Sequence, residues 1–234
     1  MKVPILTAQQ MQNIASVHGY SLLHIPHLDN ISIEDACNIA VDLGSTIGSL
    51  SMRESNQGIT LVQPSLMSGT FSSKIGHAPL HTDSSYRTDP EHWILLICVR
   101  PAIIGGETLL VDTSDLRIKL KQKPDYFELL SSPLWSFIGP SIFGHPAVHQ
   151  VPVITPTMVR WRPDCTQPSS PFNNTKNSKL YDVLQWFNDI VLECHTHKLS
   201  LCTGDALLIN NWSMLHGRNY FDDLDRLLLR ARIW

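Results

Sequence analysis

The sequence lacks the long apolar runs and the basic runs that mark two large classes of protein. No segment approaches the roughly 18 consecutive apolar residues that a membrane-spanning helix needs, and the apolar run at the start is too short for a signal peptide. No cluster of Lys or Arg offers the surface that nucleic acids or anionic membranes attract, and the formal net charge is -3. We therefore expect no membrane association and no nucleic-acid partner.

Cysteine is also sparse, and the common nucleotide and nucleophile motifs are missing. The five cysteines are odd in number and scattered, which favours reduced thiols in a cytoplasmic protein over a disulfide framework. No Gly-x-Ser-x-Gly, P-loop or dinucleotide-binding glycine pattern occurs. No internal repeat or interdomain linker divides the 234 residues, so we expect a single domain over residues 1–234.

The hydrophobic pattern predicts many short strands with helices near the two ends. Apolar residues recur at helical spacing at about residues 7–18, 32–44, 114–121, 124–130 and 178–195. Strands are expected at about residues 19–25, 59–63, 80–86, 93–99, 107–111, 158–162, 206–210 and 226–233. This order is not the strict alternation of a parallel α/β fold, and it favours a mainly β jelly roll flanked by helices. The polar segments 45–73 and 163–177 are expected to be the most mobile.

The segment that carries the chemistry is His81-Thr82-Asp83. If residues 80–86 form a strand, the side chains of His81 and Asp83 point the same way. An imidazole and a carboxylate on one face are two of the three ligands of the facial metal site used by non-haem Fe(II) oxygenases. The third ligand must come from far along the chain, and His216 is our candidate.

A bound dianion such as 2-oxoglutarate would need a cation away from the metal. Arg226 and Arg230 lie on the predicted last strand, which is otherwise apolar, and i and i+4 share a face. A guanidinium matches a carboxylate with two parallel hydrogen bonds, and a buried carboxylate without a partner is very costly. We predict that Arg226 binds the far carboxylate and that the hydroxyl of Thr108 adds a hydrogen bond.

These residues resemble a known family, the taurine dioxygenase and clavaminate synthase-like group of Fe(II)/2-oxoglutarate-dependent oxygenases. The matching segments, in the order of the family, are residues 81–86, 105–112, 204–211, 216–218 and 226–230. The resemblance implies a double-stranded β-helix core, iron at His81, Asp83 and His216, and 2-oxoglutarate at Thr108 and Arg226. Arg230 corresponds to the second arginine of the family, which lies near the co-substrate or binds an acidic group of the primary substrate. Which arginine takes which role is open at this stage.

The resemblance also implies a reaction. With Fe(II) and dioxygen, 2-oxoglutarate is decarboxylated to succinate and carbon dioxide, and a small-molecule substrate is hydroxylated. We expect an amino acid or an amino-acid derivative, free or tethered to a carrier. Halogenating relatives have Gly or Ala in place of Asp83, so halogenation is disfavoured, whereas desaturation or cyclisation stays open. A non-catalytic binding protein and a metal hydrolase are the alternatives from other classes.

Other residue patterns are weaker candidates for sites. His145 and His149 have the spacing of a helical metal pair, but Gly144 and Pro146 disfavour a helix. A zinc site could combine four residues beyond the last predicted helix, which are Cys194, His195, His197 and Cys202. Arg160 and Arg162 share a face of a predicted strand and could bind a substrate carboxylate. At least one of Ser84, Ser85, Tyr86 and Arg87 is expected to meet the substrate. The tryptophans are expected mainly to pack in the core, and Trp161 and Trp212 are the two that could face the pocket instead.

Overall fold

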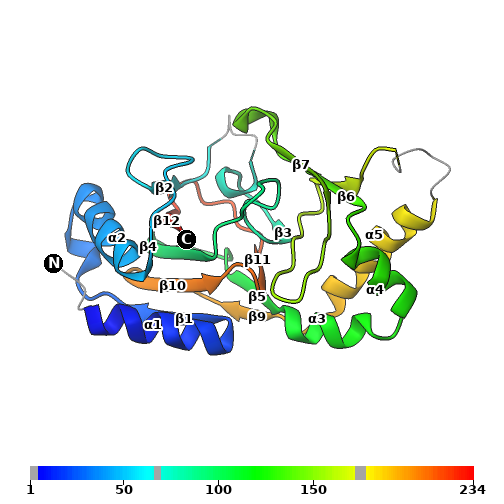
Figure 1. Ribbon diagram of the computed structural model, residues 1–234. Coiled ribbons are helices and arrows are strands. Elements are labelled where there is room, and N and C mark those ends of the chain that lie inside the picture. The colour runs from blue at the N-terminus through cyan, green and yellow to red at the C-terminus, as the bar shows by residue number, and fades with distance from the viewer. Residues whose placement is uncertain (1–4, 66–69, 172–177) are drawn as a thin grey trace.

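The computed structural model describes residues 5–65, 70–171 and 178–234. Its helices are α1 (Ile5–His18), α2 (Ile33–Ile47), α3 (Thr113–Leu120), α4 (Pro124–Ser131) and α5 (Ser178–Glu193). Its strands are β1 (Tyr20–His24), β2 (Ile59–Val62), β3 (Ala78–His81), β4 (Trp93–Arg100), β5 (Thr108–Asp112), β6 (Trp135–Ile138), β7 (Ala147–Val151), β8 (Thr166–Pro168), β9 (His197–Leu199), β10 (Asp205–Asn210), β11 (Met214–Arg218) and β12 (Leu227–Ile233). The expectation of a mainly β fold with flanking helices is confirmed (Figure 1).

Two antiparallel sheets form the centre of the molecule. One has five strands in the order β1-β10-β4-β12-β2, and the other has four in the order β3-β11-β5-β9. Because successive side chains of a strand point to opposite faces, each sheet gives one face to the core between them. That core consists of Val62, Ile94, Leu96, Cys98, Leu110, Leu207, Ile209, Met214 and Leu228. The order of the strands is not the order of the chain, and the two sheets form the predicted jelly roll.

Helices α1 and α2 cover the outer face of the five-stranded sheet (Figure 1). The hydroxyl of Ser32 accepts a hydrogen bond from the Asp35 N–H and caps α2, as the sequence predicts. The helix continues past the expected end at Gly44 as far as Ile47. Gly44 is buried inside the helix, and the absence of a side chain there avoids a collision with Leu50.

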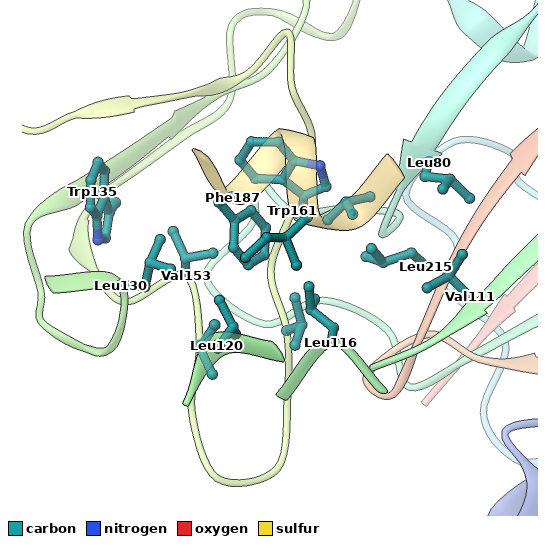
Figure 2. Close-up of a cluster of buried hydrophobic side chains, with 14 of the residues drawn as sticks. Leu80, Val111, Leu116, Leu120, Leu130, Trp135, Val153, Trp161, Phe187 and Leu215 are labelled. Atoms are coloured by element: carbon teal, nitrogen blue, oxygen red, sulfur yellow. The ribbon is translucent and has the colours of Figure 1, made fainter. Parts of the chain in front are cut away.

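A third sheet, ordered β7-β6-β8, packs with α3, α4 and α5 into a second hydrophobic cluster. Figure 2 shows this cluster, in which Trp161 and Phe187 meet edge to face with their ring centroids 4.7 Å apart. The cluster reaches the outer face of the four-stranded sheet through Leu80, Val111 and Leu215. The four-stranded sheet is therefore buried on both faces, which explains why its strands show little alternation of apolar and polar residues.

Several sequence predictions about strands are wrong. The predicted strand at residues 80–86 ends at His81, and Ser84 adopts a left-handed conformation with φ of 56°. The predicted strand at residues 158–162 makes a single bridge between Ile154 and Val159. Strand β11 was not expected, and the three strands of the third sheet lie within residues 132–177, where the sequence predicts short strands and loops but not their bounds.

The start of α1 differs from the expectation, and parts of the two polar segments are not described. Helix α1 begins at Ile5, two residues before the start expected from the sequence, and ends at His18 as expected. Residues 66–69 and 172–177, which belong to the segments expected to be mobile, lie outside the described residues. In the part of the chain that the structure describes, no helix combines the length and the apolar character that crossing a bilayer requires.

Candidate metal centre

The two candidate histidines face each other across neighbouring strands. His81 at the end of β3 and His216 in β11 are direct partners in the antiparallel ladder, and their ring centroids are 4.5 Å apart. The register shifts between His216 and Arg218, which indicates a bulge. A side chain at the intervening Gly217 would lie only 2.8 Å from the carbonyl oxygen of Ala78. Glycine at this position therefore lets β3 and β11 approach closely enough for the two imidazoles to share one site.

Asp83 reaches the same site from the turn that follows β3. The side chain of Asn211 accepts a hydrogen bond from the Asp83 N–H (2.8 Å) and donates one to the Asp83 carbonyl oxygen (3.1 Å). The backbone of Thr82 is tied to Trp161 by a hydrogen bond of 2.7 Å from its N–H to the Trp161 carbonyl. The alternation of a strand was expected to align His81 and Asp83. Instead, the strand ends at His81, and a buried turn held by Asn211 brings Asp83 beside it.

The three side chains place one ligand atom each around a common point. The Asp83 Oδ1 atom lies 3.4 Å from the His81 Nε2 and 3.7 Å from the His216 Nε2, and all three residues are buried. One ligand atom from each residue lies within 4.8 Å of the other two. The His81 Nδ1 lies 2.8 Å from the carbonyl oxygen of Pro79, which leaves Nε2 to face the site. Two imidazoles and one carboxylate are the donor set of a ferrous facial triad, so these residues fit that ion.

The charges around the triad favour its metal-binding protonation states. Burial by itself raises the pKa of Asp83, but Arg232, Arg230 and the two histidines together hold it well below its usual range. Burial and the neighbouring His81 lower the pKa of His216. Near neutral pH the site therefore presents a carboxylate and at least one neutral imidazole, which are the forms that bind a metal.

A pocket extends from the triad into the space between the two sheets. It is lined by His81, His216, Thr108, Arg218, Arg226 and Arg230 together with apolar side chains of β2, β4 and β12. Thr108 is the first residue of β5 and is paired with Arg218 of β11. The structure thus brings all six residues singled out in the sequence to one place, since Asp83 adjoins the two histidines.

Arg226 is a buried cation without an anionic partner. Its side chain is only 4% exposed, and among the described residues no carboxylate lies within ion-pair distance of it. Its guanidinium lies 5.0 Å from the ring centroid of Phe221. Burial lowers its pKa, because desolvation disfavours the charged form. Gly106, at φ of 74°, approaches the guanidinium so closely that a side chain would come within 3.3 Å of the Arg226 Nε.

Arg218 also lines the pocket and was given no role in the sequence analysis. Its Nη2 donates to the carbonyl oxygens of Phe71, Lys74 and Gly76, at 3.2, 2.7 and 3.2 Å. Its guanidinium group also lies over the ring of Phe221, 4.4 Å from the ring centroid. Burial first, and then the nearby Arg226, lower its pKa to about 10. Arg218 thus holds the segment from Phe71 to Gly76 against the pocket.

Arg230 also lines the pocket, and it belongs to a ring of four charged side chains that includes Asp83 of the triad. Its Nη1 lies 3.4 Å from the Asp83 Oδ2, and its Nη2 lies 3.1 Å from the Glu54 Oε2. Arg232 makes the same two contacts, at 2.9 Å to Asp83 and 2.5 Å to Glu54. Sequence reasoning missed Glu54 and Arg232. The signal for Arg232 was present, because it shares a strand face with Arg230.

The weaker candidates have structural partners instead. Arg160 donates to the carbonyl oxygens of Ser85, Arg87 and Thr88, so it holds the turn after β3. Arg162 pairs with Asp164 and lies over the rings of Phe71 and Tyr86.

Neither tryptophan singled out in the sequence lines the pocket. Trp161 packs on Phe187, and Trp212 stacks on His92. Within the described ranges, the triad is the one group of three or more potential ligands arranged to hold a metal, so the histidines at 145 and 149 and the Cys–His segment 194–202 form no such group.

Comparison with known proteins places these features in a family. The family model described as "Taurine catabolism dioxygenase TauD, TfdA family" matches residues 2–232. A taurine hydroxylase-like protein, SAT17 of Stachybotrys chartarum, is 32% identical over 168 residues, which are 67% of this chain and 43% of that protein. The gamma-butyrobetaine dioxygenase of Homo sapiens is 24% identical over 180 residues, which are 69% of this chain and 44% of the human protein. The chain thus matches less than half the length of these relatives.

Solved structures with the same fold share little sequence with the chain. Asparagine oxygenase, in complex with Fe(II), 2S,3S-3-hydroxyasparagine and succinate, superposes with a TM-score of 0.76 at 14% identity, covering 98% of this chain and 78% of that one. The non-haem iron oxygenase OrfP, in complex with Fe and alpha-ketoglutaric acid, superposes with a TM-score of 0.71 at 17% identity, covering 99% and 80%. At these identities the likeness establishes the double-stranded β-helix fold.

Proposed function

The chain belongs to the TauD/TfdA family of dioxygenases, and from this premise we propose that it is an Fe(II)- and 2-oxoglutarate-dependent oxygenase of a small molecule. We assign the metal to His81, Asp83 and His216, and the far carboxylate of 2-oxoglutarate to Thr108 and Arg226. The reaction is proposed to proceed within one oxygenase domain over residues 1–234.

One observation carries this proposal, namely that an unpaired buried arginine and the triad share one pocket. A buried guanidinium without an anion is costly, because nothing offsets its desolvation. A ligand that brings a carboxylate to Arg226 and chelates a metal at the triad offsets that cost. 2-Oxoglutarate has both groups, a 2-oxo acid at one end and a carboxylate at the other. A metal hydrolase using the same three ligands would leave Arg226 without a partner.

The contacts of the two arginines support a division of roles that the sequence left open. Both terminal nitrogens of Arg230 are engaged by Asp83 and Glu54, so its fork is not free for a second carboxylate. Among the described residues, the buried Nε of Arg230 has no hydrogen-bond partner. The fork of Arg226, by contrast, contacts no carboxylate among the residues that the structure describes. We therefore propose that Arg226, with the Thr108 hydroxyl, binds the carboxylate in the bidentate mode that guanidinium groups favour.

The proposed reaction consumes one 2-oxoglutarate and one dioxygen for each substrate, and releases succinate, carbon dioxide and the hydroxylated product. Bound iron supplies the activation of dioxygen, while this chain binds and orients the reactants. The buried position of the triad excludes bulk water from the reacting centre. Arg218 holds the segment from Phe71 to Gly76 at the pocket and so contributes to that exclusion.

We propose an amino acid or an amino-acid derivative as the primary substrate, either free or tethered to a carrier. Support comes from proteins to which this chain is similar. One is an asparagine oxygenase bound to a hydroxyasparagine, and another is OrfP, which has been solved with Fe and L-Arg. The five unpaired cysteines favour a reducing compartment, and we propose the cytoplasm.

Succinate formation tests the proposed activity. Protein loaded with Fe(II) is given 2-oxoglutarate, air and a panel of free amino acids, and succinate and hydroxylated product are quantified together. We expect the two to form in equal amounts with at least one amino acid. Absence of succinate in every mixture, together with no binding of 2-oxoglutarate to the Fe(II)-loaded protein, would refute the proposed activity. If 2-oxoglutarate binds but no free amino acid reacts, a free amino-acid substrate is excluded and a carrier-tethered one is favoured.

A further inference from the structure

The two carboxylate oxygens of Asp83 have different neighbours. Both histidine Nε2 atoms face Oδ1, at 3.4 and 3.7 Å. Both arginines contact Oδ2, Arg232 through Nε at 2.9 Å and Arg230 through Nη1 at 3.4 Å. Oδ1 is therefore directed toward the candidate metal position, and Oδ2 is held away from it by two guanidinium groups.

The backbone of Asp83 has little freedom to alter this arrangement. Asn211, which is 1% exposed, bonds to both the N–H and the carbonyl oxygen of Asp83. The remaining freedom is rotation of the carboxylate about its own side-chain bonds. The contact of 2.9 Å from the Arg232 Nε is the shortest that the carboxylate makes, so Arg232 has the strongest hold on this rotation.

Glu54 keeps the two arginines in place and balances their charge. Its Oε2 lies 2.5 Å from Arg232 and 3.1 Å from Arg230, and the side chain is only 13% exposed. Two buried arginines facing Asp83 alone would carry an excess positive charge, whereas two arginines and two carboxylates are balanced. The two arginines thus connect Glu54 to the Oδ2 of Asp83, which is both a member of the ring and a member of the triad.

We propose that Arg232 is a positioning residue that makes Asp83 a ligand through a single oxygen. This inference rests on the proposed function. A carboxylate can chelate a metal with both oxygens, and with two histidines it would then fill four of six positions. A 2-oxo acid chelate would fill the other two and leave none for dioxygen. If Asp83 binds through Oδ1 alone, the site would have room for both 2-oxoglutarate and dioxygen.

Arg232 is a cleaner subject for a test than Arg230. Arg230 lines the co-substrate pocket, so its loss would change the pocket directly, whereas Arg232 does not line it. The variants are Arg232→Gln, which removes the charge, and Arg232→Lys, which keeps the charge without the planar fork. Arg100→Gln is the matched control, because Arg100 is a half-exposed arginine of the same sheet that pairs with the exposed Asp225.

The experiment is an anaerobic titration of each Fe(II)-saturated protein with 2-oxoglutarate, followed by the visible charge-transfer absorption. Changes in contacts around metal ligands typically cost 10- to 100-fold in affinity or activity. We expect R232Q to bind 2-oxoglutarate about 10- to 100-fold more weakly than the parent protein, with a shifted band. R232K is expected to recover part of the loss, and R100Q is expected to match the parent. A merely structural role would lower the unfolding temperature without changing the band or the affinity of the folded protein.

The outcomes separate this inference from the proposed function. If the parent protein shows no band, the proposed function fails. If the parent shows a band and folded R232Q has the same band and affinity, the role of Arg232 is overturned. If R232Q does not fold, the double variant with Glu54→Gln and Arg232→Gln takes its place in the titration. It removes one charge of each sign, and we expect the same loss of 2-oxoglutarate affinity. Glu54→Gln alone leaves the Arg232 contact with Asp83 intact, so it should change the band and the affinity less than R232Q does. An equal shift in E54Q would show that charge balance, not the Asp83 contact, causes the effect, and would overturn the proposal.

Discussion

A buried arginine is unpaired at one end of the site, whereas two buried arginines are paired with carboxylates at the other end. At the end formed by Thr108 and Arg226, the arginine, a residue that is 4% exposed, has no carboxylate within ion-pair distance among the described residues. At the other end, Asp83 and Glu54 are bridged by Arg230 and Arg232. Arg226 directly precedes strand β12, and Arg230 and Arg232 lie within it, so residues close together in the sequence include both an unpaired cation and paired ones.

This difference distinguishes an arginine that binds a ligand from arginines that hold other side chains in place. Proteins rarely leave a buried charge unpaired, so an unpaired one indicates a ligand of opposite charge. Paired charges have no such need and instead fix the position of the groups that they contact. The number of arginines on β12 therefore says little about their roles, whereas their partners distinguish them. The predictions below use substitutions that should affect one end and spare the other.

The largest effect is expected for Asp83→Ala, which removes the point where the triad and the charged ring meet. Fe(II) binding and succinate formation should both be lost. The two arginines would then face Glu54 alone, and breaking such a buried pair costs about 3–5 kcal/mol of stability. Equilibrium dialysis against Fe(II) and urea unfolding measure the two effects. Asp225→Ala, at an exposed ion pair, is the control and should change neither.

The second effect contrasts Arg226→Met with Arg230→Met. Hydrogen bonds to charged groups contribute about 1.5–3 kcal/mol, so R226M should weaken 2-oxoglutarate binding by about 10- to 100-fold. It should leave the free energy of unfolding unchanged or slightly higher, because it removes an unpaired buried charge. R230M should lower that free energy by about 3 kcal/mol, because it leaves Asp83 and Glu54 short of a partner. Equal losses of stability in the two variants would contradict the distinction between the two ends.

The smallest effect is expected for Thr108→Val, which replaces a hydroxyl with a methyl group of similar size. One neutral hydrogen bond contributes about 1 kcal/mol, so the dissociation constant of 2-oxoglutarate should rise about fivefold. Unfolding should be nearly unaffected. Thr113→Val provides a matched comparison, since Thr113 is a buried threonine at the start of α3 that does not line the pocket. An unchanged dissociation constant in the Thr108 variant would remove its hydroxyl from the co-substrate site.

Local patterns in the sequence predicted the helices well, because helical periodicity is a property of adjacent residues. They also singled out His81, Asp83 and His216, which the structure brings together. The reason given for aligning His81 with Asp83 was wrong, because Asn211 holds a turn where a strand was expected. That contact joins residues 128 positions apart, and no periodicity within a segment reveals it.

The missed residues share the same property. Glu54 lies in a loop before β2, yet it pairs with Arg232 of the last strand, 178 positions later in the sequence. Arg218 belongs to a motif that the sequence analysis quoted, but its three carbonyl partners lie more than 140 positions away. Sequence patterns thus gave the residue types of the site, whereas tertiary contacts decide which charges are paired.

The most direct test of the central claim compares two ligands that differ only in the far carboxylate. 2-Oxoglutarate and 2-oxopentanoate share the chelating end and the chain length, and only the first has a group for Arg226. Each is titrated anaerobically into the Fe(II)-loaded parent protein and into R226M while the charge-transfer band is recorded. The parent should bind 2-oxoglutarate at least about tenfold more tightly than 2-oxopentanoate, and this preference should vanish in R226M. A parent protein without the preference, or an R226M variant that keeps it, would contradict the assignment of the unpaired arginine to the co-substrate.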